Sequence, residues 1–267
     1  MKIIDVHAHA YPDSLAPKAM AGLCAVNKSA VPATDGTVSG LLKAMDRGGV
    51  YASFVLPIAT KPKQAPSILK WVKSFASERL IPFGSVHPFS ENFEHDLDAF
   101  RSAGIKGIKL HPMYQDFCVD DRKVFPLYEA LSGMDFTVLF HAGYDIAFPE
   151  SRNASADKFV KVMDNFPKLR IVAAHMGGWK RYCEVRELLC GRDIWFDTSF
   201  INEIPETLRK DIFASHDMEK FLFGTDCPWA YAEDMAALLR SLPELNAESI
   251  ENIFHKNAEK LLSLTNM

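Results

Sequence analysis

The chain has 267 residues, of which 48% are hydrophobic and 24% are charged, a composition that suits one large α/β domain or two small ones. Its net charge is −4 without a run of Lys or Arg, which argues against nucleic acid as a partner. No apolar run is long enough to span a bilayer, and an acidic residue at position 5 comes too early for a signal peptide. The five scattered cysteines suit reduced thiols, so we expect a cytoplasmic protein.

Eight short apolar runs predict eight β-strands. Most are continuous hydrophobic stretches, the pattern typical of strands that are covered on both faces. They comprise residues 2–8, 50–56, 81–86, 105–110, 135–140, 170–174, 193–198 and 220–224.

Amphipathic segments lie between these runs and predict helices. Thr37 is a candidate N-cap, and Pro66 suits a first helical turn. The predicted helices comprise residues 37–47, 66–79, 91–103, 121–132, 156–165, 179–190, 205–215, 231–241 and 247–264. Residues 10–36, with three prolines, are expected to be an irregular insertion after the first strand.

Eight alternating strand and helix units in this length favour a closed (β/α)8 barrel, formed by residues 1–267 as one domain. A doubly wound open sheet is the alternative. It lacks support, because no Gly-x-Gly-x-x-Gly follows the first strand and no phosphate-binding Gly-rich loop with Lys-Ser/Thr is present. In a barrel, the 10–36 segment would lie over the C-terminal mouth, where substrate walls are built.

The first strand carries the sequence Asp5-Val6-His7-Ala8-His9. Because side chains alternate along a strand, Asp5, His7 and His9 are expected to point the same way. Two imidazoles on one face can bind one metal ion, and Asp5 could orient one of them. The alternative is that both histidines are hydrogen-bonded core groups.

Further polar residues end other predicted strands. They are Lys109 and His111 after the fourth strand, His141 after the fifth, His175 after the sixth and Asp226 after the eighth. All would lie at the C-terminal face of the barrel, where enzymes of this fold keep their chemistry. A purely structural role would not require them to share one end of the sheet.

The ordered set of strand-end motifs resembles the amidohydrolase superfamily, in particular the branch around aminocarboxymuconate-semialdehyde decarboxylase. The resemblance covers the whole chain and rests on Asp5-Val6-His7-Ala8-His9, Gly107-Ile108-Lys109-Leu110-His111-Pro112, Phe140-His141-Ala142-Gly143, Ala174-His175-Met176-Gly177-Gly178 and Gly224-Thr225-Asp226-Cys227-Pro228-Trp229.

The resemblance implies one divalent metal, with zinc expected and manganese or iron as alternatives. Its ligands would be His7, His9, His141 and Asp226. His175 would be a base beside a metal-bound water, and Asp226 could accept the proton of that water and deliver it to a leaving group.

Lys109 has two interpretations. Binuclear members of the superfamily carry a carboxylated lysine in this region, which bridges two metals. We expect instead an unmodified ammonium that binds a substrate carboxylate. His111 is expected to point to the same face of the strand as Lys109, so it is a second candidate for substrate binding. Alternatively, it only marks the end of the strand. Trp179 and Trp229 could form pocket walls or pack between helices.

These residues predict a metal-dependent hydrolase of a small, carboxylate-bearing molecule. The alternative is a non-oxidative decarboxylase or hydratase that uses the same site, because the scaffold does not fix the reaction. A nuclease or phosphatase is disfavoured by the missing basic face, and a non-catalytic metal-binding barrel by the acid–base groups. We expect neither a membrane nor a nucleic acid as a partner. The resemblance also suggests a homodimer.

Overall fold

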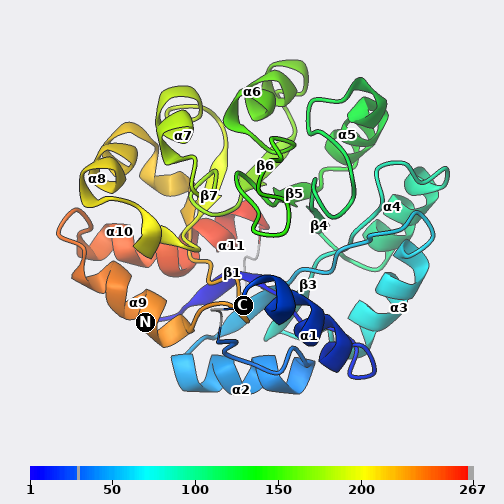
Figure 1. Cartoon of the computed structure of the whole chain (residues 1–267), viewed down its shortest axis with the longest axis horizontal. Helices are drawn as coiled ribbons and strands as arrows, with labels where there is room; N and C mark the ends of the chain where they lie inside the picture. The colour runs from blue at the N-terminus through cyan, green and yellow to red at the C-terminus, as the bar shows by residue number, and fades with distance from the viewer. Residues whose placement is uncertain (29–30, 264–267) are drawn as a thin grey trace.

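Eight parallel strands close into a barrel in the computed structural model, which describes residues 1–28 and 31–263 (Figure 1). The strands are β1 (Ile4–Ala8), β2 (Ala52–Val55), β3 (Leu80–Pro82), β4 (Gly107–Leu110), β5 (Thr137–Phe140), β6 (Arg170–Ala173), β7 (Trp195–Asp197) and β8 (Phe221–Leu222). The predicted eight strands are thereby confirmed.

Neighbouring strands pair in chain order, and two sets of contacts complete the ring. One sheet has the order β1-β2-β3 and the other β4-β5-β6-β7-β8. Between β3 and β4, the N–H of Gly84 donates to the carbonyl of Gly107 at 2.8 Å. Between β1 and β8, the N–H of Val6 donates to the carbonyl of Phe223 at 2.8 Å. The sheet is therefore closed, which excludes the open doubly wound alternative.

The helices form a ring around the strands, as Figure 1 shows. They are α1 (Ala16–Val26), α2 (Val38–Gly48), α3 (Ala65–Phe75), α4 (Phe93–Ser102), α5 (Phe125–Gly133), α6 (Ala156–Asn165), α7 (Tyr182–Leu188), α8 (Glu206–Ser215), α9 (Ala232–Ser241), α10 (Ala247–Glu251) and α11 (Asn257–Leu261). Thr37 caps α2 as predicted, with its side chain accepting from the N–H of Gly40. Within the described residues, none of the helices has the length and apolar character needed to cross a membrane.

The segment 10–36 is not wholly irregular, because it contains α1. The prolines suggested an irregular loop, but Pro17 lies in the first turn of α1. A proline in the first turn removes no hydrogen bond, since the N–H of that position has no partner within the helix. The expected location is confirmed, because Leu23 and Val26 of α1 line the large cavity at the barrel mouth.

Other helix boundaries shift for local reasons. The helix predicted at 179–190 begins only at Tyr182, because Lys180 has a positive φ of 56° that a helix cannot accommodate. The helix predicted at 66–79 ends at Phe75. The segment predicted as one helix at 247–264 contains a π-helical turn, Asn252–Lys256, between α10 and α11. Its predicted last residue, 264, lies outside the described residues.

The core has two layers. The larger one lies between the strands and the surrounding helices. The smaller one fills the lower part of the barrel, where Ile4 and Val6 of β1 pack with Leu261 and Leu262 at the end of α11. The C-terminal helix thus closes the end of the barrel opposite the mouth.

A β-bulge in β1 changes the direction of its side chains. Asp5 pairs with Ser53 and Ala8 with Val55, so three steps along β1 match two along β2. A bulge inserts one residue and reverses the alternation beyond it. Val6 therefore packs inside the barrel, and His7 also faces its interior cavity. Asp5 lies on the other side, with Leu41 of α2. The prediction that Asp5 points the same way as His7 is wrong for this reason.

The inner layer allows a stability test. We expect Leu261→Ala to lower the free energy of unfolding by about 2–5 kcal/mol, because Leu261 is 3% exposed and its loss leaves a cavity. The control is Leu188→Ala in α7, where leucine is 37% exposed and the expected loss is within about 0.5 kcal/mol. Urea denaturation of both variants measures the difference. Equal losses would show that α11 does not close the barrel.

Candidate metal centre

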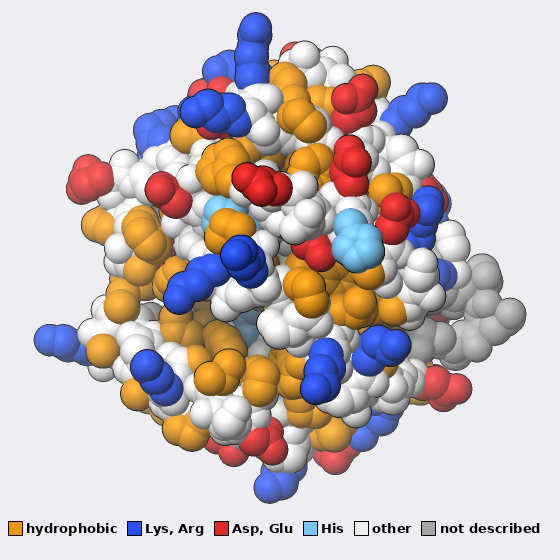
Figure 2. All heavy atoms as spheres, turned by 90° about the vertical axis from the view of Figure 1, so that its right-hand side faces the viewer, with side chains coloured by type: hydrophobic (Ala, Val, Ile, Leu, Met, Phe, Trp, Pro, Cys, Tyr) orange, Lys and Arg blue, Asp and Glu red, His pale blue; other side chains and the backbone are white. Residues whose placement is uncertain are grey.

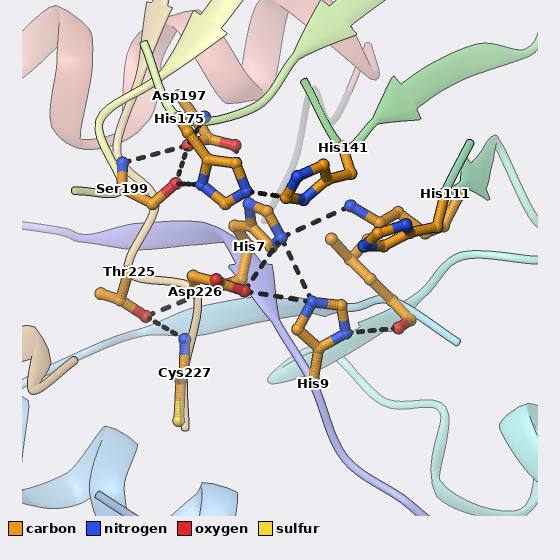
Figure 3. Close-up of polar contacts among 12 residues, drawn as sticks. His7, His9, His111, His141, His175, Asp197, Ser199, Thr225, Asp226 and Cys227 are labelled. Carbon is orange, nitrogen blue, oxygen red and sulfur yellow. Dashed lines mark hydrogen bonds and ion pairs between the residues drawn. The ribbon is translucent and has the colours of Figure 1, made fainter. Parts of the chain in front are cut away.

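The strand-end residues selected from the sequence gather at the mouth of the barrel (Figure 3). Six of them line a cavity of about 320 Å³, namely His7, His9, Lys109, His111, His141 and Asp226. The seventh, His175, is 1% exposed and adjoins this group, with its ring stacked on that of His7.

Three donor atoms form a triangle at the centre of this group. The Nε2 atoms of His7 and His9 lie 3.2 Å apart, and each lies 3.2 Å from Oδ1 of Asp226. The three side chains come from β1, from the residue just after it and from the loop that follows β8 (Figure 3). Strands that are neighbours only because the barrel closes therefore bring these atoms together.

The outer nitrogens of both imidazoles fix their tautomers. Nδ1 of His7 lies 2.8 Å from Oδ2 of Asp197, and Nδ1 of His9 lies 2.8 Å from the carbonyl of Leu56. A carboxylate and a carbonyl only accept hydrogen bonds, so each Nδ1 carries the proton. Each Nε2 consequently presents a lone pair to the centre of the triangle.

This arrangement fits a metal ion. The three atoms lie 3.2 Å apart, yet no hydrogen bond can join them when both rings are neutral, because each atom offers only a lone pair. With bonds of about 2.0–2.1 Å, neighbouring ligands of a tetrahedral or octahedral ion lie roughly 2.8–3.4 Å apart. The outer partners Asp197 and Leu56 are of the kind that orient ligating histidines.

Beside this triangle, two further histidine nitrogens face each other, one from His175 and one from His141. Nε2 of His175 lies 3.1 Å from Nδ1 of His141. Nε2 of His141 donates to the carbonyl of Tyr144 at 2.9 Å. Nδ1 of His175 lies 2.7 Å from Oγ of Ser199, whose proton goes to Asp197 in a short hydrogen bond. Neither facing nitrogen therefore carries a proton. His7, His175 and Asp226 also have potential ligand atoms within 4.8 Å of one another, so His175 as well as His141 is placed to ligate.

Burial keeps these imidazoles neutral. Loss of solvent lowers the pKa of His7 and of His175 well below the usual value, and it lowers the pKa of His141 to about 4. Burial raises the pKa of Asp226, but its interactions with His7 and His9 lower it by more, and the net pKa is lowered. Near neutral pH these three imidazoles are thus neutral and the Asp226 carboxylate is ionised, the forms that bind metals.

Lys109 is a buried amine within this polar group. Its side chain is fully buried and lines the cavity, as predicted, with Nζ 3.5 Å from Nε2 of His7. Burial lowers the pKa of Lys109 to about 8, although Asp226 and Asp197 act in the opposite direction. The amine is therefore mostly an ammonium at pH 7.

His111 has the opposite tautomer. Its Nδ1 accepts the N–H of Tyr114 at 3.4 Å, so Nε2 carries the proton and faces Oδ2 of Asp145 at 3.5 Å. His111, His141 and Asp145 form a second group with metal-binding atom types. However, Nε2 of both His111 and His141 is protonated, which leaves no inward lone pair for a cation there. His111 instead presents an N–H to the cavity wall.

The backbone at two of the strand ends is unusual. His175 has a φ of 60° and Asp226 a φ of 57°, values that are uncommon for residues other than glycine. Residues held in such conformations concentrate at functional sites. Both turns direct the side chain toward the centre where the lone pairs converge.

Sequence reasoning missed Asp197 and misassigned Asp5. Asp197 is the last residue of β7, so the strand-end criterion that selected the other residues would have found it. Asp5 does not orient an imidazole: its Oδ1 accepts the backbone N–H of His7 at 3.0 Å, and its Oδ2 accepts the Thr225 hydroxyl at 2.6 Å. Burial raises the pKa of Asp5 to about 7. Trp179 and Trp229 line the cavity, which confirms the first of their two interpretations.

Comparisons with known proteins agree with this architecture. Residues 4–264 match the amidohydrolase family Amidohydro_2. None of the curated proteins matches the sequence. An uncharacterised TIM-barrel protein from Bordetella bronchiseptica is 19% identical, with a TM-score of 0.79 over 98% of this chain and 99% of that one.

Two solved structures of named activity are similar in fold. A 5-carboxyvanillate decarboxylase from Sphingomonas paucimobilis is 15% identical, with a TM-score of 0.70 over 98% of this chain and 99% of that one. A probable 2-pyrone-4,6-dicarboxylic acid hydrolase from Acinetobacter baumannii, solved with citric acid bound, is 15% identical, with a TM-score of 0.70 over 98% of this chain and 100% of that one. At these identities the likeness concerns the fold.

The family match spans nearly the whole chain, the barrel closes in the expected order, and the predicted strand-end histidines meet at its mouth. The chain is therefore a TIM-barrel enzyme of the amidohydrolase family.

Proposed function

We propose that this enzyme is a metal-dependent hydrolase of a small, carboxylate-bearing substrate. The observation that carries the proposal is the triangle of Nε2 of His7, Nε2 of His9 and Oδ1 of Asp226, each 3.2 Å from the others. Such a triangle of unprotonated donors is chemically reasonable as a cation site. We expect zinc, and manganese or iron would accept the same ligand types.

A divalent cation held there would supply a more acidic water and a polarised substrate carbonyl. Asp226 is the first candidate for the general base, because its ionised carboxylate lines the cavity. His175, the base expected from the resemblance, remains a second candidate, because its potential ligand atom lies within 4.8 Å of those of His7 and Asp226. Through Nε2, His175 could also stabilise charge that develops at the centre or add a ligand to it.

Lys109 would select the substrate. Its ammonium is fully buried and lies within 3.5 Å of His7, so a carboxylate bound to it would place the rest of a small molecule beside the triangle. His111 would contribute an N–H to the same binding site. The cavity of about 320 Å³ is of the size that encloses a small molecule.

A second candidate function is non-oxidative decarboxylation of an aromatic or unsaturated acid. The observation that favours it is the aromatic wall of the cavity, formed by Tyr11, Tyr114, Trp179, Phe200 and Trp229. Flat rings of this kind suit a planar substrate. The similarly folded 5-carboxyvanillate decarboxylase gives this candidate further support.

One assay separates the two reactions. The metal-loaded enzyme is incubated with carboxylate-bearing lactones, esters and amides, and with aromatic carboxylic acids. Acid release and carbon dioxide release are both recorded. Hydrolysis predicts a new acid without carbon dioxide, and decarboxylation predicts carbon dioxide without consumption of water.

The metal site is tested by removing two ligands. We expect the double variant His7→Ala, His9→Ala to lose the bound metal and all activity, because two of the three donor atoms disappear. Elemental analysis of purified protein measures the metal. The matched control, His95→Ala with His255→Ala, removes two histidines away from the mouth and should leave both unchanged. Full metal content in the first variant would refute the proposal.

The role of Asp197 gives a test based on tautomers. Its Oδ1 accepts the N–H groups of His175 and Ser199, each at 3.0 Å. In Asp197→Asn the amide oxygen must keep these bonds, so the NH2 group faces Nδ1 of His7. His7 would then carry its proton on Nε2, where a ligand needs a lone pair.

We expect Asp197→Asn to weaken metal affinity by about 10–100-fold. Titration with a metal chelator measures the change, and Asp193→Asn on the surface serves as the control. Unchanged affinity in Asp197→Asn would show that His7 does not ligate through Nε2.

Lys109 is tested by removing its charge. We expect Lys109→Met to raise the KM for a carboxylate substrate by about 10–100-fold, the usual value of a hydrogen bond to a charged group, while metal content stays the same. The methyl ester of the same substrate is the control, because it cannot form the ion pair. Loss of metal in this variant would instead support a carboxylated Lys109 that bridges two ions.

A further inference from the structure

A second hollow opens beside the catalytic cavity, between α1 and α3, and has a volume of about 430 Å³. We call it the α1–α3 groove. Its walls include Leu15, Ala19 and Leu23 of the α1 region, and Ile68 and Trp71 of α3. Figure 2 shows the side of the molecule that carries α3, where hydrophobic side chains gather around a hollow.

The groove is apolar. Among the described residues, no Lys, Arg, Asp or Glu lines it. Its polar side chains near the start of α3 form hydrogen bonds locally: Thr60 donates to the Gln64 side chain at 3.2 Å, and Ser67 donates to the backbone carbonyl of Gln64 at 2.8 Å. The catalytic cavity differs sharply, because charged groups such as Lys109 and Asp226 line it.

The groove reaches the catalytic centre. Five residues line both hollows, namely His9, Tyr11, Leu23, Ile58 and Tyr114. His9 also belongs to the donor triangle, so the groove and the catalytic cavity share one side chain of the proposed metal site. Leu15, which lines the outer part of the groove, is 54% exposed, so this part of the groove is open to solvent.

We propose that the α1–α3 groove binds the apolar tail of the substrate. The enzyme would thus act on amphipathic acids, whose carboxylate meets Lys109 and whose hydrocarbon chain or ring extends between α1 and α3. This inference rests on the proposed function, since it uses Lys109 as the carboxylate anchor. The continuity of the groove with the catalytic cavity supports a substrate tail as the occupant.

Straight-chain carboxylates test this proposal. Acetate, butanoate, hexanoate and octanoate, below their micellar concentrations, are titrated into the metal-loaded enzyme in a calorimeter. Each methylene buried in the groove should tighten binding by about fourfold. The gain should stop once the chain is longer than the groove.

Two substitutions in α1 locate the effect. Ala19→Trp places a bulky ring in the groove, so it should abolish the dependence on chain length while affinity for acetate and metal content stay unchanged. Ala21→Trp, at an exposed position of α1 that does not line the groove, should keep the full dependence.

Three results would overturn the proposal. One is a wild-type affinity that does not rise with chain length, and another is a chain-length dependence that survives in Ala19→Trp. The third is a wild-type dimer in sedimentation that Ala19→Trp dissociates, because a second copy would then cover the groove. A flat series with metal and acetate still bound rejects only the groove, whereas absence of metal rejects the proposed function itself.

Discussion

The positions of a few imidazole protons control the whole site. His7, His9, His141 and His175 each direct one nitrogen to an acceptor outside the cavity, so the other nitrogen faces the centre without a proton. The acceptors come from separate parts of the chain, including the residue after β2, the end of β7 and the loop after β5. The ligand geometry is therefore a property of the closed barrel and not of any one strand.

Burial serves this arrangement in a second way. Removing solvent from an imidazole or an amine disfavours its charged form, which is why the pKa of His141 falls to about 4 and that of Lys109 to about 8. A histidine must lose its added proton before it can bind a metal, so the same desolvation favours the form of these histidines that can bind a cation. Lys109 keeps most of its charge at pH 7 and gives the cavity one fixed positive group near that cation site.

Much of this site could be predicted because parallel strands in a barrel end on the same face. Polar residues at those ends, such as His141 and Asp226, are conspicuous after apolar runs. The bulge in β1 could not be predicted, because a short strand with few polar residues gives no clear alternation in which an extra residue would be visible. Asp5 was placed on the wrong side as a result. Helix α1 was missed because a proline such as Pro17 usually interrupts a helix, and the sequence alone does not show that it lies in the first turn.

The bulge also couples the register of β1 to the binding of an ion. Only the bulged register turns His7 toward His9 and Asp226, so an ion that binds this register stabilises it by RT ln(1 + [M]/Kd), about 2.7 kcal/mol at a hundredfold excess over Kd. Without an ion, Asp5 still holds the register through the N–H of His7 and the hydroxyl of Thr225. The carboxylate on the helix side of β1 thus preorganises the proposed metal site without contacting its donor atoms.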